Sequence, residues 1–186
     1  MSNILCLDLA TVTGWAVLLG DGRTIQSGTQ SFAINARVEG AGMRYLRFRH
    51  WMDTMHSMYP ISRIAFEEVK QRAASVAAGH MYGGFMATLT AWCEERSVPY
   101  EGVPVQTIKK HVTGKGNASK DDVIKAMRSK GHAVRDDNEA DALALLYYVM
   151  TYATSSTPDQ RSAPDRSPAR RVPLDPFRLP RRPVSR

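Results

Sequence analysis

The sequence has only two cysteines, Cys6 and Cys93, and both lie among apolar residues. This placement indicates buried, reduced thiols and disfavours a disulfide framework or a cysteine-ligated metal site. Long apolar runs are also missing, because no segment reaches the about 20 residues that a membrane-spanning helix needs. The first residues lack a basic start followed by an apolar stretch, so we expect no signal peptide. These absences favour a cytoplasmic protein without a membrane anchor.

Proline and excess charge are scarce in most of the chain and concentrated near its end. Residues 155–186 hold seven of the ten prolines and eight arginines, against three aspartates. Such a segment cannot fill a core, so we expect a disordered basic tail, which either contacts a polyanion or is simply solvated. Residues 1–154 are nearly neutral and long enough for one domain with a sizeable core.

Residues 1–154 alternate between strand and helix patterns. Apolar and β-branched runs predict five strands, over residues 3–9, 13–19, 23–32, 62–69 and 98–103. Helical spacing of apolar residues predicts five helices, over residues 39–58, 75–96, 104–112, 119–131 and 138–154. The first three strands follow one another directly, which predicts an antiparallel meander. The fold class is therefore α/β, with a five-stranded mixed sheet flanked by helices.

Carboxylates occur at the edges of three separate apolar runs. Asp8 lies inside the run 4–10, where a buried carboxylate is costly unless something pairs with it. Glu67 and Glu68 end a second run, and the acidic group 136–141 opens a third. Strand alternation lets only one of the two glutamates face a shared site, and it does not decide which. A divalent metal, which needs several convergent oxygens, is the simplest common cause.

Helical geometry divides the acidic group 136–141. Asp141 shares a helical face with Asp137 and with Asn138, whereas Glu139 lies about 200° around the helix from Asp141. Asp136 is expected at or before the helix start. Acids in a first turn also stabilise the helix dipole and cap free N–H groups, which would explain Asp136, Asp137 and Asn138 without a metal. Asp141 lies deeper, and that alternative does not explain it.

A basic stretch with two glycines covers residues 106–120. Its lysines could bring positive charge and backbone N–H groups against phosphates. These lysines are Lys109, Lys110, Lys115 and Lys120. The spacing differs from that of a nucleotide-binding phosphate loop, and a solvated turn is the simpler alternative.

The helix expected at 75–96 carries small residues every fourth position. Gly79, Gly83, Ala87 and Ala91 form one stripe along it. Such a stripe allows another backbone to approach closely. Either the stripe packs against this chain's own sheet and helices, or it pairs with a second copy across a two-fold axis.

Together the acidic segments resemble the RuvC family of Holliday-junction resolvases, in the RNase H-like superfamily. Asp8, followed by Thr13-Gly14, resembles the family's first-strand aspartate and the turn after it. The motif Phe66-Glu67-Glu68-Val69 is similar to the family's second acidic motif, and this likeness selects Glu67. The motif Asp141-Ala142-Leu143-Ala144 resembles its final metal-binding aspartate. The resemblance covers roughly residues 3–150. Its motifs are most similar to those of phage and prophage members, which would place the protein in a host cytoplasm.

The resemblance implies a crossover junction endodeoxyribonuclease with an RNase H-like fold. Such an enzyme is a homodimer that cuts branched DNA at paired positions, leaves 5′-phosphate nicks, and uses two Mg²⁺ or Mn²⁺ ions per site. The implied metal ligands are Asp8, Glu67, Asp137 and Asp141, with Asn138 as a possible carbonyl ligand. Lys109 and Lys120 fall at the family's two DNA-contacting lysines. The wider set of expected DNA contacts is Lys109, Lys110, Lys115, Lys120 and Lys70.

Two positions depart from the family pattern. Asn138 stands where many members have Asp or His, and it offers a carbonyl oxygen without charge. Lys70 stands where the family often has an aromatic wedge, a role that Tyr82 could fill instead. Three alternatives stay open: a non-catalytic module that binds branched nucleic acid, an actin-like ATPase, whose first strand also carries an Asp, and a nuclease for RNA–DNA hybrids.

Overall fold

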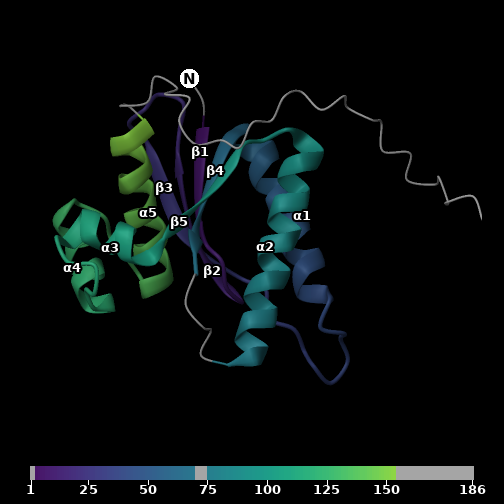
Figure 1. Cartoon of the computed structure of the whole chain (residues 1–186). Coiled ribbons are helices and arrows are strands. Elements are labelled where there is room, and N and C mark those ends of the chain that lie inside the picture. Colours follow the sequence, from purple (N-terminus) through teal and green to yellow (C-terminus); the bar gives the residue numbers. More distant parts are fainter. Residues whose placement is uncertain (1–2, 70–74, 154–186) are drawn as a thin grey trace, which may run out of the picture. The chain divides into compact units, whose positions relative to one another are not determined.

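The computed structural model describes residues 3–69 and 75–153. The strands are β1 (Asn3–Asp8), β2 (Val12–Leu18), β3 (Ile25–Ser31), β4 (Ile61–Glu68) and β5 (Tyr100–Pro104). The helices are α1 (Met43–Met58), α2 (Val76–Arg96), α3 (Val105–Thr113), α4 (Lys120–Ser129) and α5 (Asp137–Ala153) (Figure 1). All ten elements predicted from the sequence are present. Lys70 and the predicted tail at 155–186 lie outside the described residues.

Helix α1 begins at Met43, four residues later than predicted. Gly42 occupies its N-cap position and makes no side-chain capping hydrogen bond, and Gly40 lies two residues earlier. Glycine costs a helix interior about 1 kcal/mol relative to alanine, so these two glycines oppose an earlier start. Helix α4 begins as expected, because Ser119 and Asp122 form a capping box there.

The five strands form one mixed sheet in the order β3-β2-β1-β4-β5. β1 pairs antiparallel with β2, and β2 pairs antiparallel with β3, which confirms the predicted meander. β4 pairs in parallel with both β1 and β5. β1 therefore lies in the centre of the sheet with both faces covered, which explains why its sequence is a continuous apolar run.

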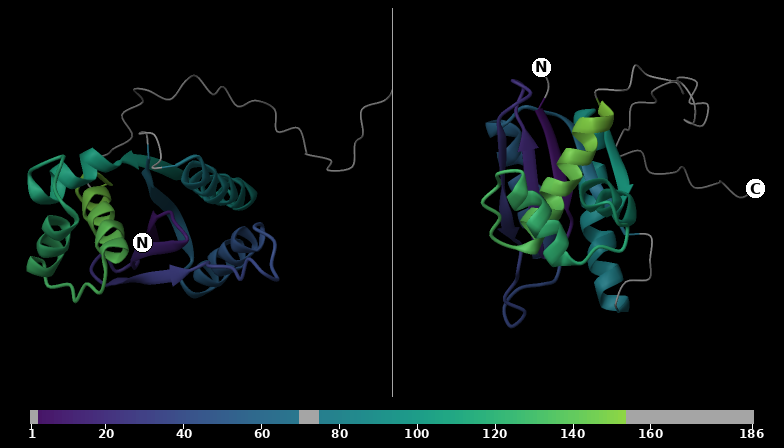
Figure 2. Two further views of the ribbon diagram at one scale, coloured as in Figure 1. Left: turned by 90° about the horizontal axis from the view of Figure 1, so that it is seen from below. Right: turned by 90° about the vertical axis from the view of Figure 1, so that its left-hand side faces the viewer.

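Helices cover both faces of the sheet. Helices α1 and α2 lie on one side, and α5 lies on the other with α3 and α4 beside it (Figure 2). The side chains of β1 alternate between the two cores: Leu5 and Leu7 belong to the α1/α2 core, and Cys6 belongs to the α5 core. Cys6 and Cys93 are both buried free thiols, as predicted. No helix among the described residues combines the length and apolar character needed to cross a membrane.

Candidate active site

Asp8 and Glu67 lie at the C-terminal ends of two adjacent parallel strands. Leu7 of β1 is in register with Phe66 of β4. The next residue on each strand is the carboxylate, so Asp8 and Glu67 lie side by side and their side chains leave the same face of the sheet. Two buried strands thus bring together acids that are far apart in the sequence.

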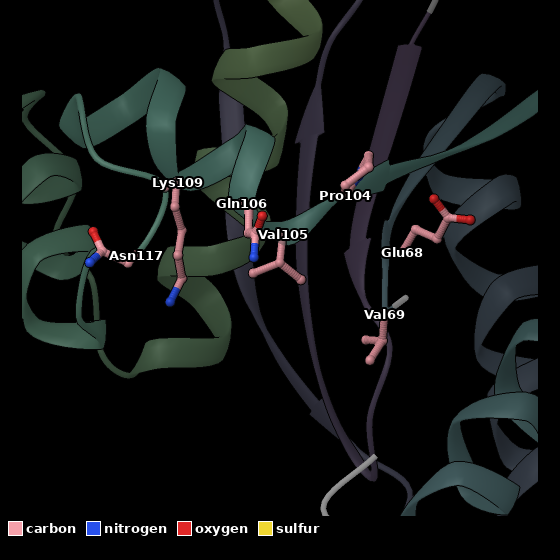
Figure 3. Close-up of a pocket in the computed structure, with 8 residues that line it drawn as sticks. Glu68, Val69, Pro104, Val105, Gln106, Lys109 and Asn117 are labelled. Carbon is pink, nitrogen blue, oxygen red and sulfur yellow. The ribbon is translucent and has the colours of Figure 1, made fainter. Parts of the chain in front are cut away.

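The face in question is the one covered by α5. Cys6 and Ala65, two residues before Asp8 and Glu67 respectively, both belong to the core beneath α5. Glu68 follows the opposite alternation, and its carboxylate points away from Lys109 in Figure 3. The structure therefore places Glu67 on the side of Asp8, a choice that strand alternation in the sequence left open.

Gly14 allows the start of α5 to lie directly against the sheet. It is the antiparallel partner of Asp8 on β2. A Cβ atom at this position would lie 1.9 Å from the backbone oxygen of Asn138. No other residue fits that gap, so glycine here sets how closely α5 approaches Asp8.

Asp136 and Glu139 fix the orientation of α5. An Asp136 oxygen accepts a hydrogen bond from the Glu139 backbone N–H at 2.9 Å, which caps the helix as expected. The buried Glu139 carboxylate accepts hydrogen bonds from the Ser27 hydroxyl at 2.7 Å and from the Arg135 N–H at 2.9 Å. Glu139 is therefore anchored to β3, and Asp141 occupies a different face of the helix, in agreement with the sequence prediction.

Asp8, Glu67 and Asp141 act on one another electrostatically. Burial, followed by the negative charge of Asp141, raises the pKa of Asp8 to about 7. Burial, followed by the charges of Asp8 and Asp141, raises the pKa of Glu67 to about 8. Burial also raises the pKa of Asp141 to about 6, against the opposing effect of two lysines. Because the charge of Asp141 acts on both Asp8 and Glu67, we treat these three residues as one acidic cluster, defined as Asp8, Glu67 and Asp141.

Two lysines lie beside the acidic cluster. Lys120 forms a hydrogen-bonded ion pair with Asp137, which lowers the pKa of that carboxyl. Lys109 donates a hydrogen bond to the Ala118 backbone oxygen at 2.9 Å, which ties α3 to the segment before α4. The positive charges of both lysines act on Glu67 and Asp141. Asp137, predicted as a possible fourth ligand, is thus paired with a lysine at the edge of the cluster.

The remaining predicted basic contacts have different surroundings. Lys110 and Lys115 are both exposed. Lys110 lies on the side of α3 that also carries His111, where the two residues line a groove together. The structure therefore brings Lys109 and Lys120 to the acidic cluster and leaves Lys110 and Lys115 at the surface.

Solved structures share this arrangement of sheet and helices. RuvC of T. thermophilus in complex with a Holliday junction substrate superposes with a TM-score of 0.69 and 20% identity, over 83% of this chain and 96% of that chain. A second Thermus thermophilus RuvC structure gives 0.66 and 21%, over 82% and 96%. The yeast mitochondrial Holliday junction resolvase Ydc2 gives 0.60 and 13%, over 82% and 79%. This chain has the RuvC fold. No protein-family model and no curated protein matches its sequence.

The acidic cluster consists of carboxylates, which are the oxygen donors that hard cations prefer. As the side chains stand, no three His, Cys, Asp or Glu groups in residues 3–69 and 75–153 are close enough to form a complete metal site. The donor types nevertheless suit Mg²⁺ or Mn²⁺, because half-buried carboxylates that repel one another gain from a divalent positive charge. Asp8, Glu67 and Asp141 are the residues that could hold it.

Tyr82 supports the end of β4, a contact that the sequence did not indicate. Its hydroxyl donates to the Glu67 backbone oxygen at 2.9 Å and accepts from the Val69 N–H at 3.3 Å. Its ring packs against the α1/α2 core. The two hydrogen bonds and the core packing hold the Tyr82 side chain in place, which disfavours the base-stacking wedge raised from the sequence. The structure shows it positioning the backbone that carries Glu67.

A cavity of about 380 Å³ lies between the end of β4 and α3 of this RuvC fold (Figure 3). Val69, Pro104 and Val105 form apolar walls. The polar lining residues are Glu68, Gln106, Lys109 and Asn117. Because Lys109 also acts on the acidic cluster, the cavity lies next to that cluster. Its volume falls within the range of about 300–1,000 Å³ that is typical of small-ligand pockets.

Proposed function

We propose that this chain is a metal-dependent endonuclease that resolves four-way DNA junctions by paired phosphodiester hydrolysis. The observation that supports this most is the acidic cluster: three half-buried carboxylates from β1, β4 and α5, all with raised pKa values and bordered by two lysines. The RuvC fold adds support, because one structure with that fold was solved with a Holliday junction substrate. Fold likeness alone does not determine a substrate, so the proposal is based mainly on the carboxylates.

Each residue has a distinct task in this proposal. Asp8, Glu67 and Asp141 would hold two Mg²⁺ or Mn²⁺ ions, and Asp137 or Asn138 would complete the set. Bound ions of this kind lower the pKa of an attacking water and stabilise the leaving 3′-oxygen, which leaves 5′-phosphate ends. Lys109 would neutralise a phosphate beside the cut.

Lys120 would act on the DNA backbone in the same way after exchanging Asp137 for a phosphate. Its side chain is 69% exposed, so it can turn toward DNA without disturbing the core. The exchange would also free the Asp137 carboxylate for a bound cation. Lys120 and Asp137 therefore form a pair that DNA and metal could separate together.

We also propose that the chain acts as a homodimer through α2. A side chain at Gly83 would meet no atom of the described chain within 4 Å, and Ala87 and Ala91 are exposed. At Gly83 the stripe therefore leaves open space on the described part of the chain, whereas the simpler alternative was packing against the chain's own sheet or helices. Two copies related by a two-fold axis would match the symmetry of a four-way junction. Sedimentation equilibrium should show a dimer that Ala87→Arg converts to a monomer.

The decisive experiment is incubation of the full chain with a synthetic four-way junction and Mg²⁺, with a linear duplex and an RNA–DNA hybrid alongside. We expect symmetric nicks in the junction only, with 5′-phosphate ends that a ligase can reseal, and no nicks in a chelator. Preferential cutting of the RNA–DNA hybrid would show that the substrate is a hybrid and not a four-way junction. Tight junction binding without cutting in Mg²⁺ or Mn²⁺ would favour a non-catalytic binding module, which the incomplete metal geometry also permits.

A further inference from the structure

An aromatic cluster lies on α3 and the last turns of α5, away from the acidic cluster. We define it as His111, Tyr148 and Tyr152. The two tyrosine rings have centroids 4.7 Å apart, and the histidine ring lies 5.6 Å from Tyr148 and 5.8 Å from Tyr152. Thr151 lies within 3.3 Å of the His111 ring nitrogen, which fixes the ring. Tyr152 is 51% exposed, so solvent reaches part of the cluster.

The aromatic cluster lines a groove of about 730 Å³ with a polar and basic rim. Lys110, Gln106 and Thr107 of α3 form that rim. Gln106 and Gly116 line both this groove and the cavity beside Lys109, so the two hollows are neighbours on the surface of α3. The groove therefore extends from the neighbourhood of the cavity to the aromatic cluster, in which Tyr152 is exposed and Tyr148 and His111 are half-buried.

Exposed aromatic rings beside a lysine are the combination that binds unpaired nucleic-acid strands. Rings stack on bases of any sequence, and the cation contacts the phosphates between them. The nearby acid of β5 does not oppose this, because the Glu101 carboxylate is paired with the Arg63 guanidinium at 2.7 Å. The charge and the ring geometry of the groove thus agree with a DNA strand as its occupant.

We propose that the aromatic cluster is a stacking site for unpaired bases of the DNA strand that enters the acidic cluster. Its position fits this role. Tyr148 and Tyr152 follow Asp141 on the same helix by seven and eleven residues, which is about 10 and about 16 Å along its axis. At about 3.4 Å per nucleotide, a strand would reach the rings three to five nucleotides from the cut phosphate. The inference depends on the proposed function for its ligand, but its test needs no cutting.

The test is fluorescence anisotropy of the full chain, in a chelator, with two labelled single strands of equal length. One strand is oligothymidine, and the other has the same phosphates without bases. We expect the wild type to bind the thymine strand about five- to tenfold more tightly, because stacking requires a base. Tyr152→Leu should remove that preference, whereas Tyr152→Phe, which keeps the ring, should retain it. Lys110→Gln should weaken binding of both strands equally.

Three results would overturn the stacking site. They are equal affinities of the wild type for both strands, an undiminished preference in Tyr152→Leu, and equal weakening of both strands by Tyr152→Leu. The junction assay described above separates this inference from the proposed function. If the chain prefers the thymine strand through Tyr152 but never cuts junctions, the stacking site stands and the proposed nuclease activity is wrong. If the chain cuts junctions but binds both strands equally, the proposed nuclease activity stands and the stacking site is wrong.

Discussion

The two faces of the sheet are packed in opposite ways. On the α1/α2 face the core is built from large rings, with Phe32, Phe48, Phe85 and Trp92 fully or almost fully buried. On the α5 face small residues predominate close to the sheet. These are Cys6, Ala16, Ala65, Ala140, Ala142 and Ala144, all fully buried. Large rings hold the first helical layer at a distance, whereas small side chains allow α5 to approach.

The carboxylates follow the same division. Asp8, Glu67 and Asp141 lie on the face with small side chains, where a close helix brings them together. On the other face Asp53 is satisfied locally: it accepts hydrogen bonds from the Trp92 indole N–H at 2.8 Å and from Arg96 at 2.5 Å. The large side chains of one face stabilise the fold, whereas the small side chains of the other face let the acidic residues come together. Substitutions on the two faces should therefore separate stability from activity.

The largest expected effect is that of Asp8→Asn on cutting. Removing one negative oxygen from the proposed metal site should lower junction cleavage by about 1000-fold or more. Junction binding should change less than about threefold, because binding depends on the lysines. Single-turnover cleavage and gel-shift titration measure the two quantities. Asp53→Asn is the matched control on the other face, and it should lower stability and leave cleavage of the folded protein unchanged.

Next in size is the effect of Trp92→Ala on stability. Removing this fully buried ring from the α1/α2 core should lower the free energy of unfolding by about 3–5 kcal/mol, and the melting temperature by about 10 °C. Cleavage per folded molecule, assayed well below that temperature, should stay within a few-fold of wild type. A loss as large as that of Asp8→Asn would show that the two faces are not separable in this way.

Gly14→Ala should lower both the stability of the fold and the rate of junction cleavage. The new methyl group would overlap the Asn138 carbonyl, so α5 must move away from β2. We expect a loss of about 1–3 kcal/mol in stability and about 100-fold in cleavage, because a small displacement of reacting groups is costly. Gly40→Ala, where the added atom meets open space in the described chain, is the control and should change neither. Wild-type cleavage by Gly14→Ala would contradict the proposed role of the close approach.

The smallest expected effect is a pH-dependent gain in stability. Without metal, the pKa of Asp8 rises from 3.8 in the unfolded chain to about 7 in the fold. Ionised Asp8 therefore destabilises the fold, and the cost grows as pH rises between these two values. In a chelator, Asp8→Asn should stabilise the protein by about 1–2 kcal/mol at pH 8 and not at pH 4. Denaturant melts at both pH values measure this, and equal changes at the two would contradict it.

Much of this fold was predictable because its signals are local. The runs around Leu5 and Ile64 predicted central strands, and the cost of a carboxylate in such a run singled out Asp8. Helical spacing separated Asp141 from Glu139, and the structure agrees with that separation. Glu67 could be preferred over Glu68 only by family resemblance, since the choice depends on which face α5 covers.

The unpredicted contacts all join distant segments. Ser27 and Glu139 are 112 residues apart, and Gly14 meets Asn138 only because α5 crosses β2. No periodicity in either segment encodes such a contact. Lys120 was predicted to bind DNA, and its ion pair with Asp137 depends on how α4 packs beside α5. The predicted roles of Lys70 and of residues 155–186 stay predictions, because they lie outside the described residues.

Calorimetric titration of Mn²⁺ into the full chain measures whether the acidic cluster binds cations. Asp8, Glu67 and Asp141 come from separate parts of the sequence, and we claim that they hold cations together. The account predicts saturable binding that weakens at least about tenfold in Asp8→Asn, Glu67→Gln and Asp141→Asn alike, and that is unchanged in Glu68→Gln. No binding by the wild type, or equal binding by all five proteins, would contradict it.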